Sequence, residues 1–230
     1  MNQYWVTNLR NPEDRYVSEW RHVVRGATWK QSILQCNRVP YYDRCFYGRC
    51  YTENWINVTL SDFNKCPYNL ASNRQTRMLG DLEFDNIDCY NNIFPINLKS
   101  PTYHYAMRKL LASAKYNLMN RISYFMLLEY QRLSQYLFEK TFGVTFSKSF
   151  TKKENTVASS YLKGTDEERQ KNLDEKIVNA RKLTEEEVAE IKALNQYDIQ
   201  LYRYAVKLFF QRIKALRLRE MQQSENRNEK

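Results

Sequence analysis

The chain has 230 residues, 43% of them hydrophobic and 14% aromatic, which excludes a disordered protein and suits one folded domain with a sizeable core. No apolar run approaches the roughly 20 residues of a membrane span, and no signal-peptide pattern follows Met1. The formal net charge of +10 lies mainly in residues 1–160, which favours a polyanionic ligand such as a sulfated glycan, a nucleotide or a nucleic acid, although a generic basic surface has the same totals.

The first two elements expected along the chain are a strand and a helix. The alternating, aromatic-rich stretch Gln3–Leu9 predicts a buried strand. Residues 12–25 predict a helix, because Pro12 suits the first helical turn and has no N–H to leave unpaired there. The acidic residues Glu13 and Asp14 follow, where the helix dipole is positive.

This predicted helix has an apolar face and a polar face. At about 100° per residue the apolar face consists of Tyr16, Trp20 and Val23. The opposite face, expected to point outward, consists of Arg15, Ser18, His22 and Arg25. Arg10 at the strand end and Ser18 in the helix could converge on one phosphate, because Arg offers forked donors and Ser a directional one. On the pattern alone, an ordinary amphipathic helix with a solvated polar face is the better interpretation.

The middle of the chain alternates between helices, one strand and irregular segments. Its patterns predict an irregular loop at 36–60, short helices at 61–66 and 73–79, a helix at 101–120, a buried strand at 124–128 and a helix at 129–142. Gly143 is a good C-cap for the last of these helices. Residues 147–159 are basic, rich in hydroxyl groups and without periodicity, and therefore predict a loop.

The C-terminal third is predicted to be helical. Capping boxes start helices at Thr165 and Thr184, within a charged segment at about 160–190 that we interpret as a solvated insertion. Residues 195–218 predict an amphipathic helix, whose apolar stripe consists of Ile199, Tyr202, Val206, Phe209, Phe210 and Ile213. We interpret the stripe as core or partner surface and residues 219–230 as a polar tail.

The five cysteines stand at positions 36, 45, 50, 66 and 89. No histidine accompanies them at zinc-finger spacing, so disulfides in an oxidising compartment are a better interpretation than a metal site, with one thiol left over. Asn57-Val58-Thr59 is a glycosylation sequon, which is a weak indication on its own.

The helix at 12–25 and several later blocks resemble the heparan sulfate 6-O-sulfotransferases. The stretch from Leu9 to Trp20 resembles the 3′-phosphate-binding segment of sulfotransferases, and Arg21–Lys30 narrows the resemblance to this family. Further blocks match in the same order: 66–79, 89–91, 113–118, 129–132 and 194–205. The resemblance covers roughly residues 3–213.

The resemblance implies an α/β sulfotransferase fold, related to P-loop nucleoside triphosphatases and mostly helical in this chain, over residues 1–218. It implies transfer of a sulfuryl group from 3′-phosphoadenosine 5′-phosphosulfate to the 6-hydroxyl of glucosamine in heparan sulfate, without a metal. The donor-binding residues it implies are Arg10, Ser18, Thr151, Lys152, Lys153, Val157 and Ala158, with Val157 at a position where the family carries arginine. The glycan-lining residues it implies are His22 and Trp29. It also implies disulfides among Cys36, Cys50, Cys66 and Cys89, and Cys45 has no counterpart.

Two parts of the family's site have no match in the sequence. These are the Gly-rich loop with Lys and Thr that holds the 5′-phosphosulfate, and the catalytic histidine. Both are expected upstream of Tyr4, as is a Golgi anchor, so we expect a C-terminal part of such an enzyme, inactive as given.

Three functional classes remain as alternatives. The first is part of a Golgi sulfotransferase, and the second is a non-catalytic heparin-binding secretory domain whose affinity does not depend on Arg10 and Ser18. The third is a basic nucleic-acid binder, which the cysteines and the lack of a recognition motif disfavour. We therefore expect heparan sulfate as partner, no nucleic acid, and membrane attachment only through an upstream anchor.

Overall fold

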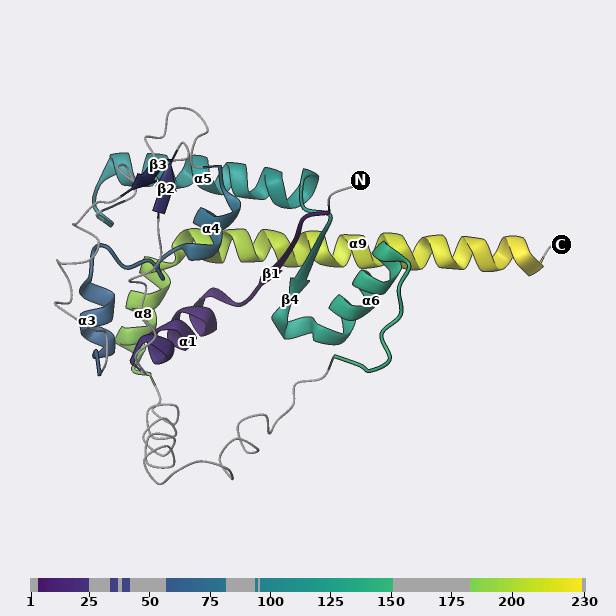
Figure 1. Ribbon diagram of the computed structural model, residues 1–230, viewed down its shortest axis with the longest axis horizontal. Helices are drawn as coiled ribbons and strands as arrows, with labels where there is room; N and C mark the ends of the chain where they lie inside the picture. Colours follow the sequence, from purple (N-terminus) through teal and green to yellow (C-terminus); the bar gives the residue numbers. More distant parts are fainter. Residues whose placement is uncertain are drawn as a thin grey trace, which may run out of the picture.

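The structure is a computed structural model that describes residues 4–24, 34–36, 39–41, 57–81, 94, 96–150 and 183–228. These residues are mostly helical, with two small sheets (Figure 1). In chain order the main elements are β1 (Val6–Leu9), α1 (Pro12–Val24), α3 (Leu60–Lys65), α4 (Arg74–Leu79), α5 (Pro101–Asn120), β4 (Tyr124–Leu127), α6 (Gln131–Phe142), α8 (Glu185–Leu194) and α9 (Gln196–Asn228). The predicted helices are therefore confirmed wherever the structure describes them.

Strands β1 and β4 form a parallel pair in which Val6 lies opposite Tyr124 and Leu9 opposite Leu127. The prediction of a buried strand is right for β4 but wrong for most of β1. Only Leu9 of β1 is buried, whereas Val6 and Asn8 are exposed, as is Trp5 just before the strand. Within the described residues β1 pairs only with β4, so its other edge and the side chains near its start are left uncovered.

Helix α1 joins one of two clusters of buried side chains. Its apolar stripe, predicted from the spacing, is buried as expected, with Tyr16 at 0% and Trp20 at 4% exposure. The stripe packs against α3 and α8, through residues that include Phe63 and Ile191. The Tyr16 hydroxyl also donates to Asn64 Oδ1 at 3.1 Å, so its one polar atom is satisfied inside the cluster.

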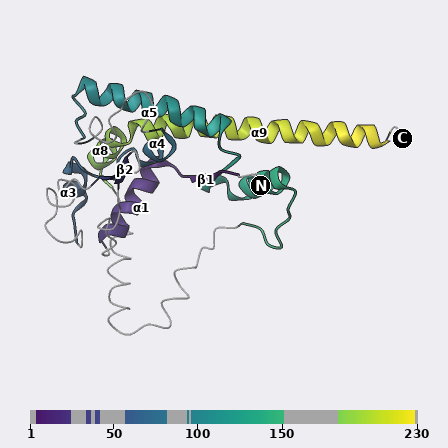
Figure 2. The same cartoon turned by 45° about the horizontal axis from the view of Figure 1, so that its top comes forward.

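Helices α5 and α9 lie side by side and, with β4, form the larger cluster (Figures 1 and 2). The buried side of α9 consists of Tyr197, Leu201, Ala205, Phe209 and Ile213. The predicted stripe was thus displaced toward the N-terminus, by two residues at its start and by one residue at the next two positions, and Phe210 is 40% exposed. Helix α9 also continues to Asn228 and projects beyond the other elements, so residues 219–228 of the expected polar tail are helical. They contain no Pro or Gly that would end the helix.

Helix boundaries follow the predicted caps. The capping box at Thr184 and Glu187 is formed in both directions, and Gly143 ends α6 with φ of 67°. A 3₁₀ turn at Leu128–Tyr130, not foreseen, precedes α6. The short strands β2 (Leu34–Cys36) and β3 (Val39–Tyr41) pair antiparallel, and β3 falls where an irregular loop was expected. Residues 151–159 of the predicted loop at 147–159 and the helix at Thr165 lie outside the described residues.

Candidate functional site

The candidate site lies at the carboxyl ends of β1 and β4. Leu9 and Leu127 end the two parallel strands opposite each other, so Arg10 and Leu128 leave the sheet at the same edge. In open α/β sheets, ligands bind in the crevice outside this edge. A pocket of about 510 Å³ opens there, and its lining consists of Leu128, Glu129, Tyr130, Gln131, Arg132, Leu133 and Phe150.

The backbone of Arg10 is held at both of its polar groups by one side chain. Gln75 Oε1 accepts the Arg10 N–H at 2.9 Å, and Gln75 Nε2 donates to the Arg10 carbonyl at 3.0 Å. The guanidinium of Arg10 makes no hydrogen bond or ion pair in the part of the chain that the structure describes. Its donors are therefore available to an anion, and the role of Arg10 in donor binding stays a prediction.

The next residue, Asn11, is fixed through both its backbone N–H and its side chain. Its N–H donates to Glu129 Oε1 at 2.7 Å, and its own side-chain oxygen accepts the N–H groups of Glu13 and Asp14, which caps the start of α1. Glu129 also accepts the Tyr202 hydroxyl at 2.6 Å through Oε2. Burial and then the Glu129 carboxylate raise the pKa of Tyr202, so this hydroxyl stays a donor.

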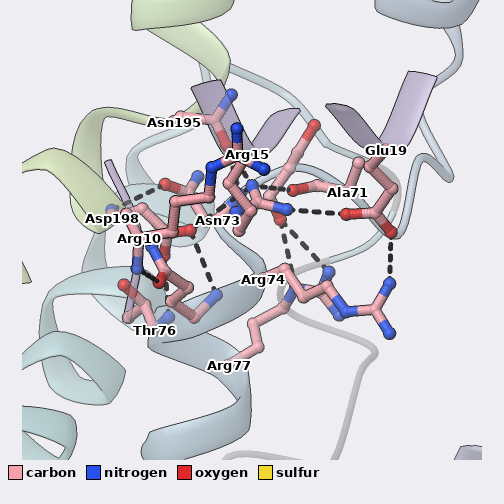
Figure 3. A network of polar contacts seen from close by, with 12 residues as sticks. Arg10, Arg15, Glu19, Ala71, Asn73, Arg74, Thr76, Arg77, Asn195 and Asp198 are labelled. Atoms are coloured by element: carbon pink, nitrogen blue, oxygen red, sulfur yellow. Dashed lines mark hydrogen bonds and ion pairs between the residues drawn. The ribbon is translucent and has the colours of Figure 1, made fainter. Parts of the chain in front are cut away.

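The predicted outward face of α1 is correct for His22, which is exposed, and wrong for Arg15. Ser18 is partly buried, and Arg25 lies outside the described residues. The Arg15 side chain is only 13% exposed and points into the protein (Figure 3). Whether Arg10 and Ser18 converge on one phosphate stays a prediction.

Arg15 is the centre of a polar network that joins α1 to two distant segments (Figure 3). One of its terminal nitrogens donates to the Ala71 carbonyl at 2.6 Å and to Asn195 Oδ1 at 2.9 Å, and lies 3.5 Å from Asp198. The other donates to Glu19 at 2.7 Å. Because all these partners are internal, Arg15 stabilises the fold and is not a ligand-binding cation.

Other predicted site residues lie outside the described part of the chain. These are Trp29, Thr151, Lys152, Lys153, Val157 and Ala158. Phe150, the last described residue before the predicted donor loop, lines the pocket, and its N–H is fixed by Gln135 Oε1 at 2.5 Å.

Reasoning from the sequence did not assign the supports of this corner. Gln75, Glu129 and Asp198 all lie in blocks that carried the family resemblance, but nothing in their local pattern shows which backbone groups they hold. The partners are 65 or more residues apart in sequence, and only the fold brings them together.

The described residues also bear on the cysteines, on metal binding and on membranes. Cys66 is buried and disulfide-bonded, but the side chains of the other cysteines are outside the described set, so the pairing stays a prediction. Among the described residues no group of His, Cys, Asp and Glu is arranged to hold a metal ion. Within that same part of the chain, no helix is both long and apolar enough to cross a membrane.

The chain is similar to known proteins over most of its length. Residues 3–205 match the Sulfotransferase family. The chain is 40% identical over 231 residues to "Heparan-sulfate 6-O-sulfotransferase 2" of Gallus gallus, covering 99% of this chain and 49% of the relative. It is 41% identical over 230 residues to the protein of the same name from Danio rerio (98% and 42%), and 40% identical over 213 residues to "Heparan-sulfate 6-O-sulfotransferase 1" of Homo sapiens (91% and 44%).

The chain spans about half the length of the curated relatives it matches, since it covers 49%, 42% and 44% of these three. These relatives confirm the resemblance to the heparan sulfate 6-O-sulfotransferases that the motifs indicated. Because the family match extends over most of the sequence, from residue 3 to residue 205, the chain belongs to the sulfotransferase family.

Proposed function

We propose that the protein binds 3′-phosphoadenosine 5′-phosphosulfate, with Arg10 and Ser18 contacting the 3′-phosphate. The observation that carries the proposal is Arg10 itself. Its backbone is fixed at the carboxyl edge of a parallel strand pair, while its guanidinium has no partner among the described residues. A planar guanidinium suits a phosphate, because it can donate two parallel hydrogen bonds to it.

The proposed reaction is the transfer of a sulfuryl group to the 6-hydroxyl of glucosamine in heparan sulfate. The acceptor oxygen forms a bond to sulfur as the bond from sulfur to the 5′-phosphate oxygen breaks, and the acceptor proton passes to a base. The products are the sulfated sugar and adenosine 3′,5′-bisphosphate. As in phosphoryl transfer, the protein contributes mainly positioning and stabilisation of charge, together with that base.

The acceptor assignment rests on the names of the relatives and on the charge of the chain. The relatives are named heparan-sulfate 6-O-sulfotransferases, and a net charge of +10 suits a sulfated polymer. In this proposal His22 and Trp29 line the glycan site, with Trp29 stacking on a sugar face and His22 donating a hydrogen bond. The segment 151–158 closes over the nucleotide. We further propose residence in the Golgi lumen with an N-terminal anchor, and glycosylation at Asn57, which is exposed.

Calorimetric titration of the protein with two nucleotides tests the proposal. Adenosine 3′,5′-bisphosphate carries the 3′-phosphate, and adenosine 5′-monophosphate lacks it. We expect the bisphosphate to bind more tightly, and Arg10→Ala to remove the difference. Arg108→Ala is the matched control, because it deletes the same charge from the exposed side of α5.

Equal affinity for the two nucleotides would contradict the assignment of the corner to the 3′-phosphate. Heparin affinity that persists unchanged in Arg10→Ala and Ser18→Ala, together with no nucleotide binding, would favour the heparin-binding domain instead. Turnover is measured separately, with the donor and desulfated heparan sulfate as substrates, and analysis of the product by disaccharide composition reports the sulfated position.

A further inference from the structure

The side chain of Gln75 is placed to act on Arg10 and on little else outside its own helix. It is 7% exposed, and its two polar atoms bond the two polar backbone atoms of Arg10, at 2.9 and 3.0 Å. In an antiparallel sheet, two opposite residues exchange a pair of N–H···O bonds. Here the side-chain amide of Gln75 takes the place of one of these residues. It fixes the peptide groups on both sides of the Arg10 Cα, and therefore the direction in which its side chain leaves the corner.

Gln75 is itself fixed by a buried carboxylate. Asp198, which is fully buried on α9, accepts the Gln75 N–H at 3.0 Å and the Thr76 N–H at 2.7 Å. Figure 3 shows Asp198 beside the start of α4, with Arg10 nearby. Both N–H groups belong to the first turn of α4, where backbone donors lack helical partners. The clamp on Arg10 is thus attached to a rigid base, not to a mobile surface side chain.

We propose that Gln75 is a positioning residue for anion binding: it does not contact the ligand but holds Arg10 in the orientation that binds the 3′-phosphate. This inference rests on the proposed function of the corner. It adds a role for a residue that lies outside the donor-binding set, and it explains why the Arg10 guanidinium can remain without an internal partner. Because the hydrogen bonds from Gln75 orient the Arg10 backbone, the Arg10 side chain needs no internal contact and can bind the ligand.

The expected effect follows from preorganisation. When only a fraction of the molecules holds Arg10 in the competent orientation, the apparent dissociation constant rises by the inverse of that fraction. Loss of two hydrogen bonds at a partly buried corner is expected to weaken bisphosphate binding by roughly tenfold. Binding of adenosine 5′-monophosphate, which lacks the phosphate that Arg10 meets, is expected to change by less than about twofold.

Gln75→Met is the variant of choice, because methionine has a similar length and helix propensity and removes both polar atoms. The readout is the ratio of the affinities for adenosine 3′,5′-bisphosphate and adenosine 5′-monophosphate, measured by calorimetry. We expect this ratio to fall toward that of Arg10→Ala, and the double variant Arg10→Ala/Gln75→Met to show no further loss. If Gln75 had a merely structural role, its substitution would weaken the binding of both nucleotides equally and leave the affinity ratio unchanged.

Asn117→Ala is the matched control. The Asn117 amide also bonds a backbone group, the Leu79 carbonyl at the other end of α4, at 2.8 Å, and it has no contact with Arg10. We expect it to preserve the ratio. If Gln75→Met does not fold, Gln75→Glu takes its place, because it keeps the acceptor for the Arg10 N–H and replaces only the donor to the carbonyl.

The outcomes separate this inference from the proposed function. A wild-type protein that does not distinguish the two nucleotides overturns both. A wild-type protein that distinguishes them through Arg10, together with a Gln75 variant that keeps the full ratio, overturns the positioning role alone. A reduced ratio in the Gln75 variant, non-additive with Arg10→Ala, supports it.

Discussion

Asn73 and Asp198 cap each other's helices. Asn73 Oδ1 accepts the N–H groups of Tyr197 and Asp198 at 2.9 and 3.1 Å, at the start of α9. The Asp198 carboxylate accepts the N–H groups of Gln75 and Thr76, at the start of α4. Helix α4 has six residues, too few to be stable alone in water. Its position, and with it the position of the clamp on Arg10, therefore depends on this reciprocal pair.

Asp198→Asn is expected to destabilise the protein by about 3–5 kcal/mol, the usual cost of breaking a buried charged contact. The new amide nitrogen would point a donor at one of the two N–H donors of α4, and the substitution would leave Arg15 without its buried carboxylate. Urea unfolding measures the change. Asp62→Asn, at an exposed cap of α3, is the control and should cost less than about 1 kcal/mol. Equal losses in the two variants would contradict the importance of the buried pair.

Substitutions at Asn73 should separate backbone strain from capping. Asn73 has φ of 47°, in the left-handed region that glycine tolerates and alanine does not. Asn73→Gly loses the cap of α9 but no strain is added, so we expect a loss of about 1–2 kcal/mol. Asn73→Ala should lose roughly 1 kcal/mol more. Urea unfolding measures both variants, and equal stability of Asn73→Ala and Asn73→Gly would contradict backbone strain at this position.

Gly80 is required by a close approach of α4 to α5, not by its backbone angles. A Cβ atom there would lie 2.9 Å from the carbonyl oxygens of both Leu110 and Thr76. Since neither oxygen belongs to a flexible side chain, Gly80→Ala should destabilise the protein by about 2–3 kcal/mol. Gly143→Ala meets open space but a φ of 67°, and should cost roughly 1 kcal/mol. Thermal unfolding compares the two, and the opposite order would refute the packing argument.

Tyr103 should make the protein sensitive to alkali. Burial raises the pKa of Tyr103 from 10.0 to about 12, against the opposing effect of the hydrogen bond from Asn73. Below about pH 10 the tyrosine is protonated in both the folded and unfolded states. Between about pH 10 and 12 only the unfolded state ionises, so roughly 2–3 kcal/mol of stability is lost as the pH rises.

Tyr103→Phe isolates this contribution from that of other tyrosines. Urea unfolding of both proteins at about pH 9 and about pH 11 should show a smaller loss in the variant, because phenylalanine cannot ionise. Equal losses would mean that Tyr103 ionises normally in the fold.

Ser18 should matter for nucleotide binding and little for stability. Its side chain makes no hydrogen bond within the described residues, so Ser18→Ala should change the free energy of unfolding by less than about 0.5 kcal/mol. A hydrogen bond to a charged phosphate contributes about 1.5–3 kcal/mol, so affinity for adenosine 3′,5′-bisphosphate should fall at least about tenfold. Ser18→Thr keeps the hydroxyl and should retain most of the affinity. Equal weakening by alanine and threonine would argue against contact through the hydroxyl.

Local patterns predicted the elements well where the relevant contacts are close in sequence. The capping box of Thr184 and Glu187, the C-cap at Gly143 and the helix start at Pro101 all depend on neighbours within one turn. The buried face of α9 was displaced because Tyr197, rather than Ile199, meets Tyr103 on α5. Which of two nearby apolar positions faces the core depends on the partner helix.

The sequence by itself determined the strand, the corner and the helix that carry Arg10 and Ser18, and the family to which they belong. It placed Arg15 on the outward face of the helix, whereas the structure buries this side chain. A buried charge needs partners, and those of Arg15 are Ala71, Asn195 and Asp198, which come from distant parts of the chain. Only the tertiary structure brought these groups to Arg15 and made it part of the interior. The same fold uses Gln75 to hold the Arg10 backbone and leaves its guanidinium without a partner among the described residues.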